Sequence, residues 1–141
     1  MNEEVKIKFN TKQYGKFLFY SSFCMFFSGW LSYYMDDAYY SIYFLILFLS
    51  SLNHWRKPEY GIRRNVDLFI VYSGVIYTLL RICLLKDEFN RYMLLSMLFC
   101  LIIFYIIEFI CVYMNSNKWV ILHMTIHLYA ALMIVFVLFD Y

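Results

Sequence analysis

Long apolar stretches separated by short polar breaks dominate the chain. Five stretches approach the roughly 20 predominantly apolar residues that a membrane-spanning helix requires. They cover residues 17–35, 38–55, 67–85, 92–114 and 119–139. The stretches lack the alternation of apolar and polar residues that a spanning β-barrel needs, and the short breaks should make neighbouring helices antiparallel. The pattern predicts an all-α integral membrane bundle of about five transmembrane helices.

The composition supports this class and excludes others. Of the 141 residues, 64% are hydrophobic and 16% are charged, whereas about 25% of the residues are charged in a typical soluble domain. The net charge of +2 is too small to indicate nucleic acid as a partner. We therefore expect a multi-pass membrane protein that has membrane lipids around it. Its long apolar outer faces leave self-association into a homo-oligomer open.

Basic residues gather on one side of the predicted bundle. With five spans, that side carries Lys6, Lys8, Lys12, Lys16, Arg56, Lys57, Arg63, Arg64 and Lys118. The other side carries Asp36, Asp37, Asp140 and the mixed cluster at residues 86–91. Loops rich in Lys and Arg stay in the cytoplasm. We therefore predict a cytoplasmic N-terminus, with a basic tail over residues 1–16 and a single transmembrane domain over residues 17–141.

The few ionisable residues inside the spans are the candidate functional residues, because burying them in a membrane is costly. All three histidines are among them. His54 ends the second span, and His123 and His127 lie near the start of the fifth. Asp67 opens the third span. The predicted topology places these four residues on the cytoplasmic side of the bundle.

The spacing of these residues indicates a chemistry. His123 and His127 are four residues apart, as are Ser50 and His54, so each pair shares one face of its helix. Three imidazoles can hold Zn²⁺ and leave a fourth position open for water, as in catalytic zinc sites. Asp67 is a candidate to orient and deprotonate that water, with Ser50 as its hydrogen-bonding partner. Because zinc makes hydroxide available at neutral pH, attack on an amide or ester carbonyl follows as the class of reaction.

The same residues admit plainer interpretations. A lone His-x-x-x-His pair is more often interfacial than metal-binding, Asp67 can be a helix N-cap, and Ser50 can bond to its own helix backbone. The chain is then a small multi-pass membrane protein without catalytic activity. A third interpretation is a haem-binding redox protein, with His54 and one histidine of the fifth span as axial ligands.

Two more charged residues lie inside the spans. Glu108, in the fourth span, lies by helical rise near the predicted depth of His127. It can support the metal ligands through hydrogen bonds, carry a proton, or be a protonated residue without a chemical role. Arg81, late in the third span, is expected to extend its side chain outward to the membrane surface.

A resemblance to a known family follows from the same motifs. They are Ser50-x-x-x-His54, Asp67 and His123-x-x-x-His127. In this order they resemble the CREST superfamily, which includes alkaline ceramidases and progestin and adipoQ receptors. The resemblance implies an intramembrane zinc site with the three histidines as ligands, Asp67 and Ser50 acting on the water, and a lipid amide or ester as substrate. Members of that superfamily have a seven-helix core, whereas five spans are predicted here.

Overall fold

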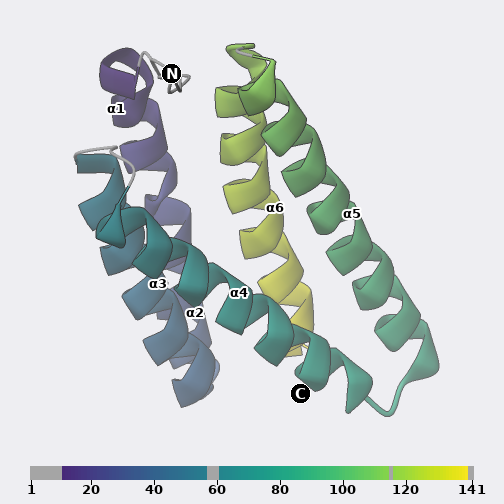
Figure 1. The fold of residues 1–141 in the computed structure, drawn as a ribbon. Helices are drawn as coiled ribbons and strands as arrows, with labels where there is room; N and C mark the ends of the chain where they lie inside the picture. Colours follow the sequence, from purple (N-terminus) through teal and green to yellow (C-terminus); the bar gives the residue numbers. More distant parts are fainter. Residues whose placement is uncertain (1–10, 57–60, 115, 140–141) are drawn as a thin grey trace.

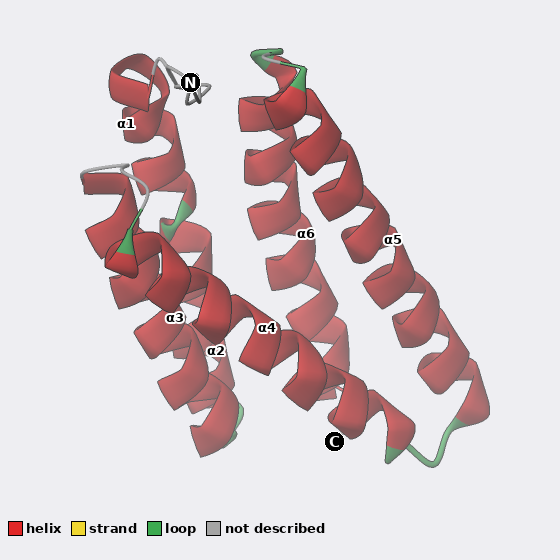
Figure 2. Ribbon diagram, viewed as in Figure 1, coloured by secondary structure: helices red, strands yellow, loops and turns green. Residues whose placement is uncertain are grey.

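The computed structural model describes residues 11–56, 61–114 and 116–139, and these residues form helices joined by short connections (Figures 1 and 2). The helices are α1 (Thr11–Ser21), α2 (Phe23–Tyr34), α3 (Ala38–Arg56), α4 (Ile62–Cys83), α5 (Glu88–Tyr113) and α6 (Lys118–Phe139). No strand occurs within these ranges. The predicted all-α class is therefore confirmed for the described part of the chain.

Three of the described helices, α4, α5 and α6, are long and apolar enough to cross a membrane. They contain 22, 26 and 22 residues, and at about 1.5 Å per residue each exceeds the roughly 30 Å of a hydrocarbon core. The helix α3, with 19 residues, is not among them, because the Tyr, Ser, Asn and His side chains at its two ends lower its mean hydropathy. The helices α4, α5 and α6 support the assignment of the chain as a membrane protein, whereas the five-span bundle and its orientation remain predictions.

The first predicted span consists of two helices. α1 ends at Ser21 and α2 begins at Phe23, with Ser22 in helical conformation between them. The hydroxyls of Ser21 and Ser22 both donate to the carbonyl of Leu18, at 2.9 and 3.0 Å. Serine hydroxyls that bond back to the backbone compete with the regular helical pattern. We attribute the interruption to this serine pair.

Helices α1 and α4 begin more than one turn earlier than the hydrophobic pattern predicts. α1 starts at Thr11, so residues 11–16 of the predicted tail are helical, and residues 1–10 of that tail lie outside the described residues. α4 starts at Ile62, and Gly61 is its N-cap, with a φ of 154° that favours glycine. Asp67 therefore lies in the second turn of α4. The expectation that it opens the helix, and its interpretation as an N-cap, are both wrong.

Two glycines allow helices of the bundle to approach closely. A Cβ atom on Gly29 of α2 would lie 3.2 Å from the Cβ of Phe44 on α3. A Cβ on Gly74 of α4 would overlap the ring of Tyr43, whose hydroxyl donates to the carbonyl of Ile70 at 3.3 Å. Small residues at such crossings are typical of membrane bundles, where close backbone approach replaces the hydrophobic effect.

The apolar core lies where α2 to α6 meet. Its buried residues are Met25, Tyr40, Phe44, Leu47, Phe48, Ile82, Leu85, Leu94, Leu98, Leu101, Met133, Ile134, Val137 and Leu138. Many other large apolar side chains point outward from the bundle, among them Phe99, Phe109 and Leu128. An apolar outer surface of this extent suits lipid rather than water as the surroundings.

The connections divide the molecule into two ends, which positions the polar residues. Figure 1 shows α5 and α6 as an antiparallel pair and α4 crossing obliquely from α3 toward the start of α5. The start of α1, the end of α3 and the α5–α6 connection lie at one end, which we call the basic end because Lys16, Arg56 and Lys118 are there. The α2–α3 and α4–α5 connections lie at the opposite end.

Candidate functional site at the basic end

Asp67 joins α4 to α3 through two serine hydroxyls. Its carboxylate Oδ1 accepts hydrogen bonds from Ser50 Oγ at 2.7 Å and from Ser51 Oγ at 2.9 Å. The side chain is 8% exposed, and bonds to a charged acceptor are among the strongest in proteins. The structure therefore brings the predicted pair Ser50 and Asp67 together. It adds Ser51, which the four-residue spacing missed, although two adjacent serines in an apolar helix were a visible signal.

His54 lies in the last turn of α3 and is buried. Its Nδ1 atom has no hydrogen-bonding partner among the described residues. His54 follows Ser50 by one turn on the same helix, and its ring centroid lies 4.5 Å from that of Trp55. A buried ring nitrogen without a partner is uncommon in folded proteins and requires an explanation.

The two histidines of α6 are close neighbours, and each is held by a different helix. Their ring centroids are 4.5 Å apart. His123 Nδ1 lies 2.9 Å from Glu108 Oε1 on α5, and His127 Nδ1 lies 3.0 Å from Ser21 Oγ on α1. The ring of Trp55, next to His54 in the chain, contacts the ring of His123 edge-on, with 5.0 Å between the two ring centroids. This contact connects the end of α3 to the histidines of α6.

Glu108 lies opposite His123 rather than at the depth of His127, so the predicted depth is wrong by one helical turn. The reason is the register of the antiparallel pair. Glu108 lies five residues before Tyr113 at the end of α5, and His123 lies five residues after Lys118 at the start of α6. Residues equally distant from a short connection face each other. The second carboxylate oxygen, Oε2, is buried and has no partner within the described ranges.

The polar residues at the basic end thus form two groups. One group joins α3 and α4 through Ser50, Ser51 and Asp67, and the other joins α1, α5 and α6 through the histidine pair and its partners. His54 and Trp55, at the end of α3, lie between the two groups. All five residues predicted as ligands or catalytic groups therefore lie at the basic end, together with Glu108.

The chemistry of these side chains suits zinc better than their present arrangement does. Imidazole nitrogens and carboxylate oxygens are zinc ligands. Three of their atoms, His54 Nδ1, His123 Nε2 and Glu108 Oε2, are buried without a partner in the described part of the chain. However, no three His, Cys, Asp or Glu side chains among the described residues are placed together as a metal-binding group. Zinc coordination would therefore require these side chains to converge further.

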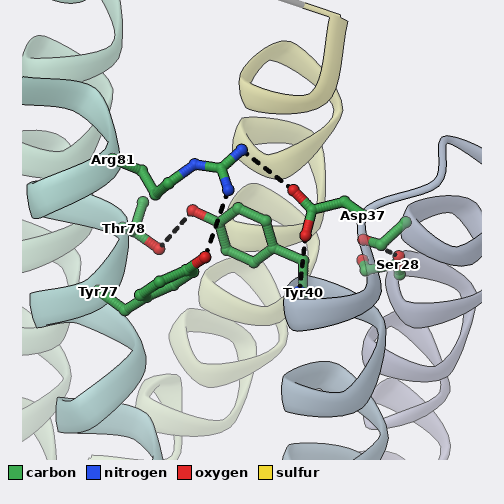
Figure 3. A network of polar contacts seen from close by, with 7 residues as sticks. Ser28, Asp37, Tyr40, Tyr77, Thr78 and Arg81 are labelled. Atoms are coloured by element: carbon green, nitrogen blue, oxygen red, sulfur yellow. Dashed lines mark hydrogen bonds and ion pairs between the residues drawn. The ribbon is translucent and has the colours of Figure 1, made fainter. Parts of the chain in front are cut away.

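A second polar cluster lies at the opposite end (Figure 3). Arg81 Nη2 is 3.0 Å from Asp37 Oδ2, and Arg81 Nη1 donates to the Tyr77 hydroxyl at 3.3 Å. The Tyr40 hydroxyl donates to Thr78 Oγ1 at 3.3 Å, while its backbone N–H donates to Asp37 Oδ1 at 3.0 Å. The expectation that Arg81 extends outward is wrong, because Asp37 at the α2–α3 connection provides a partner inside the bundle.

No family model matches the chain, and no curated protein or solved structure is significantly similar to it. The resemblance to the CREST superfamily rests on five residues and their order. The function of the chain must therefore be inferred from the chemistry of the polar side chains at the basic end.

Proposed function

We propose that the protein is a multi-pass membrane protein that binds zinc through His54, His123 and His127 and hydrolyses a lipid amide or ester. The observation that carries the proposal is the pair of buried, unpartnered ring nitrogens, His54 Nδ1 and His123 Nε2, within the described helices. A buried polar atom left without a hydrogen bond costs about 1–3 kcal/mol. Binding a metal ion would satisfy such atoms, because a neutral imidazole binds metal through the lone pair of its unprotonated nitrogen.

In this proposal the basic end faces the cytoplasm and the site lies just inside it. The orientation follows from the excess of Lys and Arg on that side. His54, two residues before the end of α3, and His123, five residues after the start of α6, lie within about 8 Å of their helix ends by rise. A lipid substrate would therefore be attacked near the level of its headgroup, where amide and ester bonds of lipids are located.

Asp67 is the proposed proton acceptor. Zinc would supply a Lewis acid that allows water to react at neutral pH. The Ser50 and Ser51 hydroxyls both donate to Oδ1, so they hold the carboxylate in one orientation. Oδ2 is the oxygen proposed to take the proton of the attacking water.

Metal content tests the binding part of the proposal. We expect about one zinc per chain in detergent-purified protein from zinc-supplemented culture, and at least a tenfold lower content in the triple variant His54→Ala/His123→Ala/His127→Ala. Ser96→Ala is the matched control, because the exposed Ser96 hydroxyl donates to the carbonyl of Met93 within α5, away from the described polar residues of the basic end. Equal zinc in the triple variant, no zinc in the unmodified protein, or a haem absorption band would overturn the zinc site.

Fatty-acid release tests the hydrolytic part. Vesicles containing lipids with a fluorescent acyl chain, in either amide or ester linkage, would be incubated with the zinc-loaded protein. We expect release from one of the two linkages by the unmodified protein and the Ser96→Ala control, and none by the triple variant. Zinc binding without release from either linkage would overturn the hydrolase and leave a non-catalytic metal site.

A further inference from the structure

We infer that Ser21 and Glu108 are positioning residues that hold both histidines of α6 in the tautomer protonated on Nδ1. Each Nε2 then presents a lone pair to a ligand. The function of this tautomer rests on the proposed zinc site, because a metal ion would bind those lone pairs. Its first test does not require zinc.

The tautomer of His127 follows from the hydrogen bonds of Ser21. The Ser21 hydroxyl lies 2.9 Å from the carbonyl oxygen of Leu18 and 3.0 Å from His127 Nδ1. A carbonyl oxygen can only accept, and a hydroxyl has one proton. Ser21 therefore donates to Leu18 and accepts from the Nδ1–H of His127. A neutral imidazole carries one ring proton, so Nε2 of His127 is unprotonated.

The tautomer of His123 follows from Glu108. With Glu108 ionised, its carboxylate can only accept hydrogen bonds, so the 2.9 Å contact between Glu108 Oε1 and His123 Nδ1 then requires an N–H donated by the histidine. The two side chains are 13% and 19% exposed, so bulk water does not replace this contact readily. In the neutral ring, His123 Nε2 then carries the lone pair, and it is a buried atom without a partner in the ranges the structure describes.

Two different helices therefore produce the same result on α6. Ser21 comes from α1 and Glu108 from α5, and both elements pack against α6. Both bonds use Nδ1, although the two rings are one turn apart and face different neighbours. Histidines that bind metals usually donate their other ring N–H to a carboxylate or another oxygen, which sets the tautomer and the orientation of the ring. The same roles are filled here by Glu108 and Ser21.

The first experiment reads the tautomers directly in the metal-free protein. Protein labelled with ¹⁵N-histidine is treated with EDTA, and long-range ¹H–¹⁵N correlation spectra distinguish Nδ1–H from Nε2–H rings. We expect both α6 histidines to be protonated on Nδ1. Ser21→Ala should mix the tautomers of His127, and Glu108→Leu should mix those of His123.

Matched variants separate positioning from folding. Ser22→Ala is the control for Ser21→Ala, because the buried Ser22 hydroxyl donates to Leu18 and contacts no histidine among the described residues. It should leave both tautomers unchanged. Glu108→Gln keeps an acceptor oxygen and should restore much of the His123 tautomer that Glu108→Leu loses. An Nε2–H ring at either position in the unmodified protein, or unchanged tautomers in both disruptive variants, would overturn the inference.

The second experiment measures zinc affinity in the same variants. We expect Ser21→Ala and Glu108→Leu each to weaken zinc binding by about 10–100-fold, while Ser22→Ala binds as the unmodified protein does. If zinc does not bind at all, the proposed function fails while the tautomer result stands on its own. If zinc binds equally tightly to all variants and their tautomers are unchanged, the positioning role fails and the zinc site stands.

Discussion

The described helices carry polar clusters at both ends of the bundle, and these differ in the groups that face their buried carboxylates. At the opposite end, the charge of Arg81 faces the charge of Asp37 at 3.0 Å, and the hydroxyls of Tyr77 and Tyr40 extend the network (Figure 3). At the basic end, the Asp67 carboxylate accepts hydrogen bonds from two neutral serine hydroxyls, and ring nitrogens of two histidines have no partner among the described residues.

This difference separates a structural cluster from a candidate functional one. An opposite charge across two helices offsets the cost of burying each ion, provided that both partners stay. Buried imidazole nitrogens without partners lower the free energy of unfolding and make no compensating contribution to the stability of the fold. We therefore expect changes at the opposite end to alter stability, and changes at the basic end to alter binding and chemistry.

The largest expected effect is that of Asp67→Asn on lipid hydrolysis. The amide oxygen can still accept the bonds from Ser50 and Ser51, so the fold and the zinc content should be retained. Loss of the proton acceptor should lower the rate about 10²–10⁴-fold, the usual contribution of a general base. The rate of fatty-acid release per bound zinc is the measurement. A rate equal to that of the unmodified protein would remove Asp67 from the reaction.

The next effect is that of Arg81→Leu on stability. Asp37 would then be buried at the α2–α3 connection without its ion partner. The free energy of unfolding should fall by about 2–3 kcal/mol. This is less than for a fully buried pair, because both side chains keep some exposure. Unfolding by SDS in mixed micelles measures it. The double variant Asp37→Asn/Arg81→Leu should recover most of the loss. A single variant as stable as the unmodified protein would show that the pair is not structural.

The smallest effect is that of Tyr40→Phe. It removes the 3.3 Å bond to Thr78 and keeps the ring in the core, so we expect a loss of about 1 kcal/mol. Zinc content should not change, because Tyr40 lies in the first turn of α3, far along the helix from His54. The same SDS titration and metal analysis apply. A drop in bound zinc in this variant would contradict the separation of the two clusters.

Much of the helical architecture could be predicted from hydropathy, whereas helix starts could not. Arg63 and Arg64 resemble a basic loop in sequence, yet both lie in the first turn of α4, because Gly61 begins the helix before them. Likewise, the apolar run at the first span hides the interruption at Ser22, which depends on where two hydroxyls point. Periodicity detects the buried face of a helix and is less sensitive to its ends.

The candidate site divides in the same way. The Ser50 and Asp67 pair could be predicted, because the short connection between α3 and α4 constrains which turns face each other. The direction of the Arg81 side chain could not be predicted, since it depends on Asp37, 44 residues earlier in the chain. Ser21 carried no signal in sequence, because its partner His127 is 106 residues away.

The amino-acid sequence by itself determined the helical class, the apolar surface of the spans and the gathering of histidines toward one end, because these depend on local hydrophobicity and on short connections. Only the tertiary structure decided which nitrogen of each α6 histidine is bonded, which carboxylate faces which ring, and where the arginine finds its counter-ion. Those choices depend on the register between helices and on side-chain directions, which contacts distant in the chain determine.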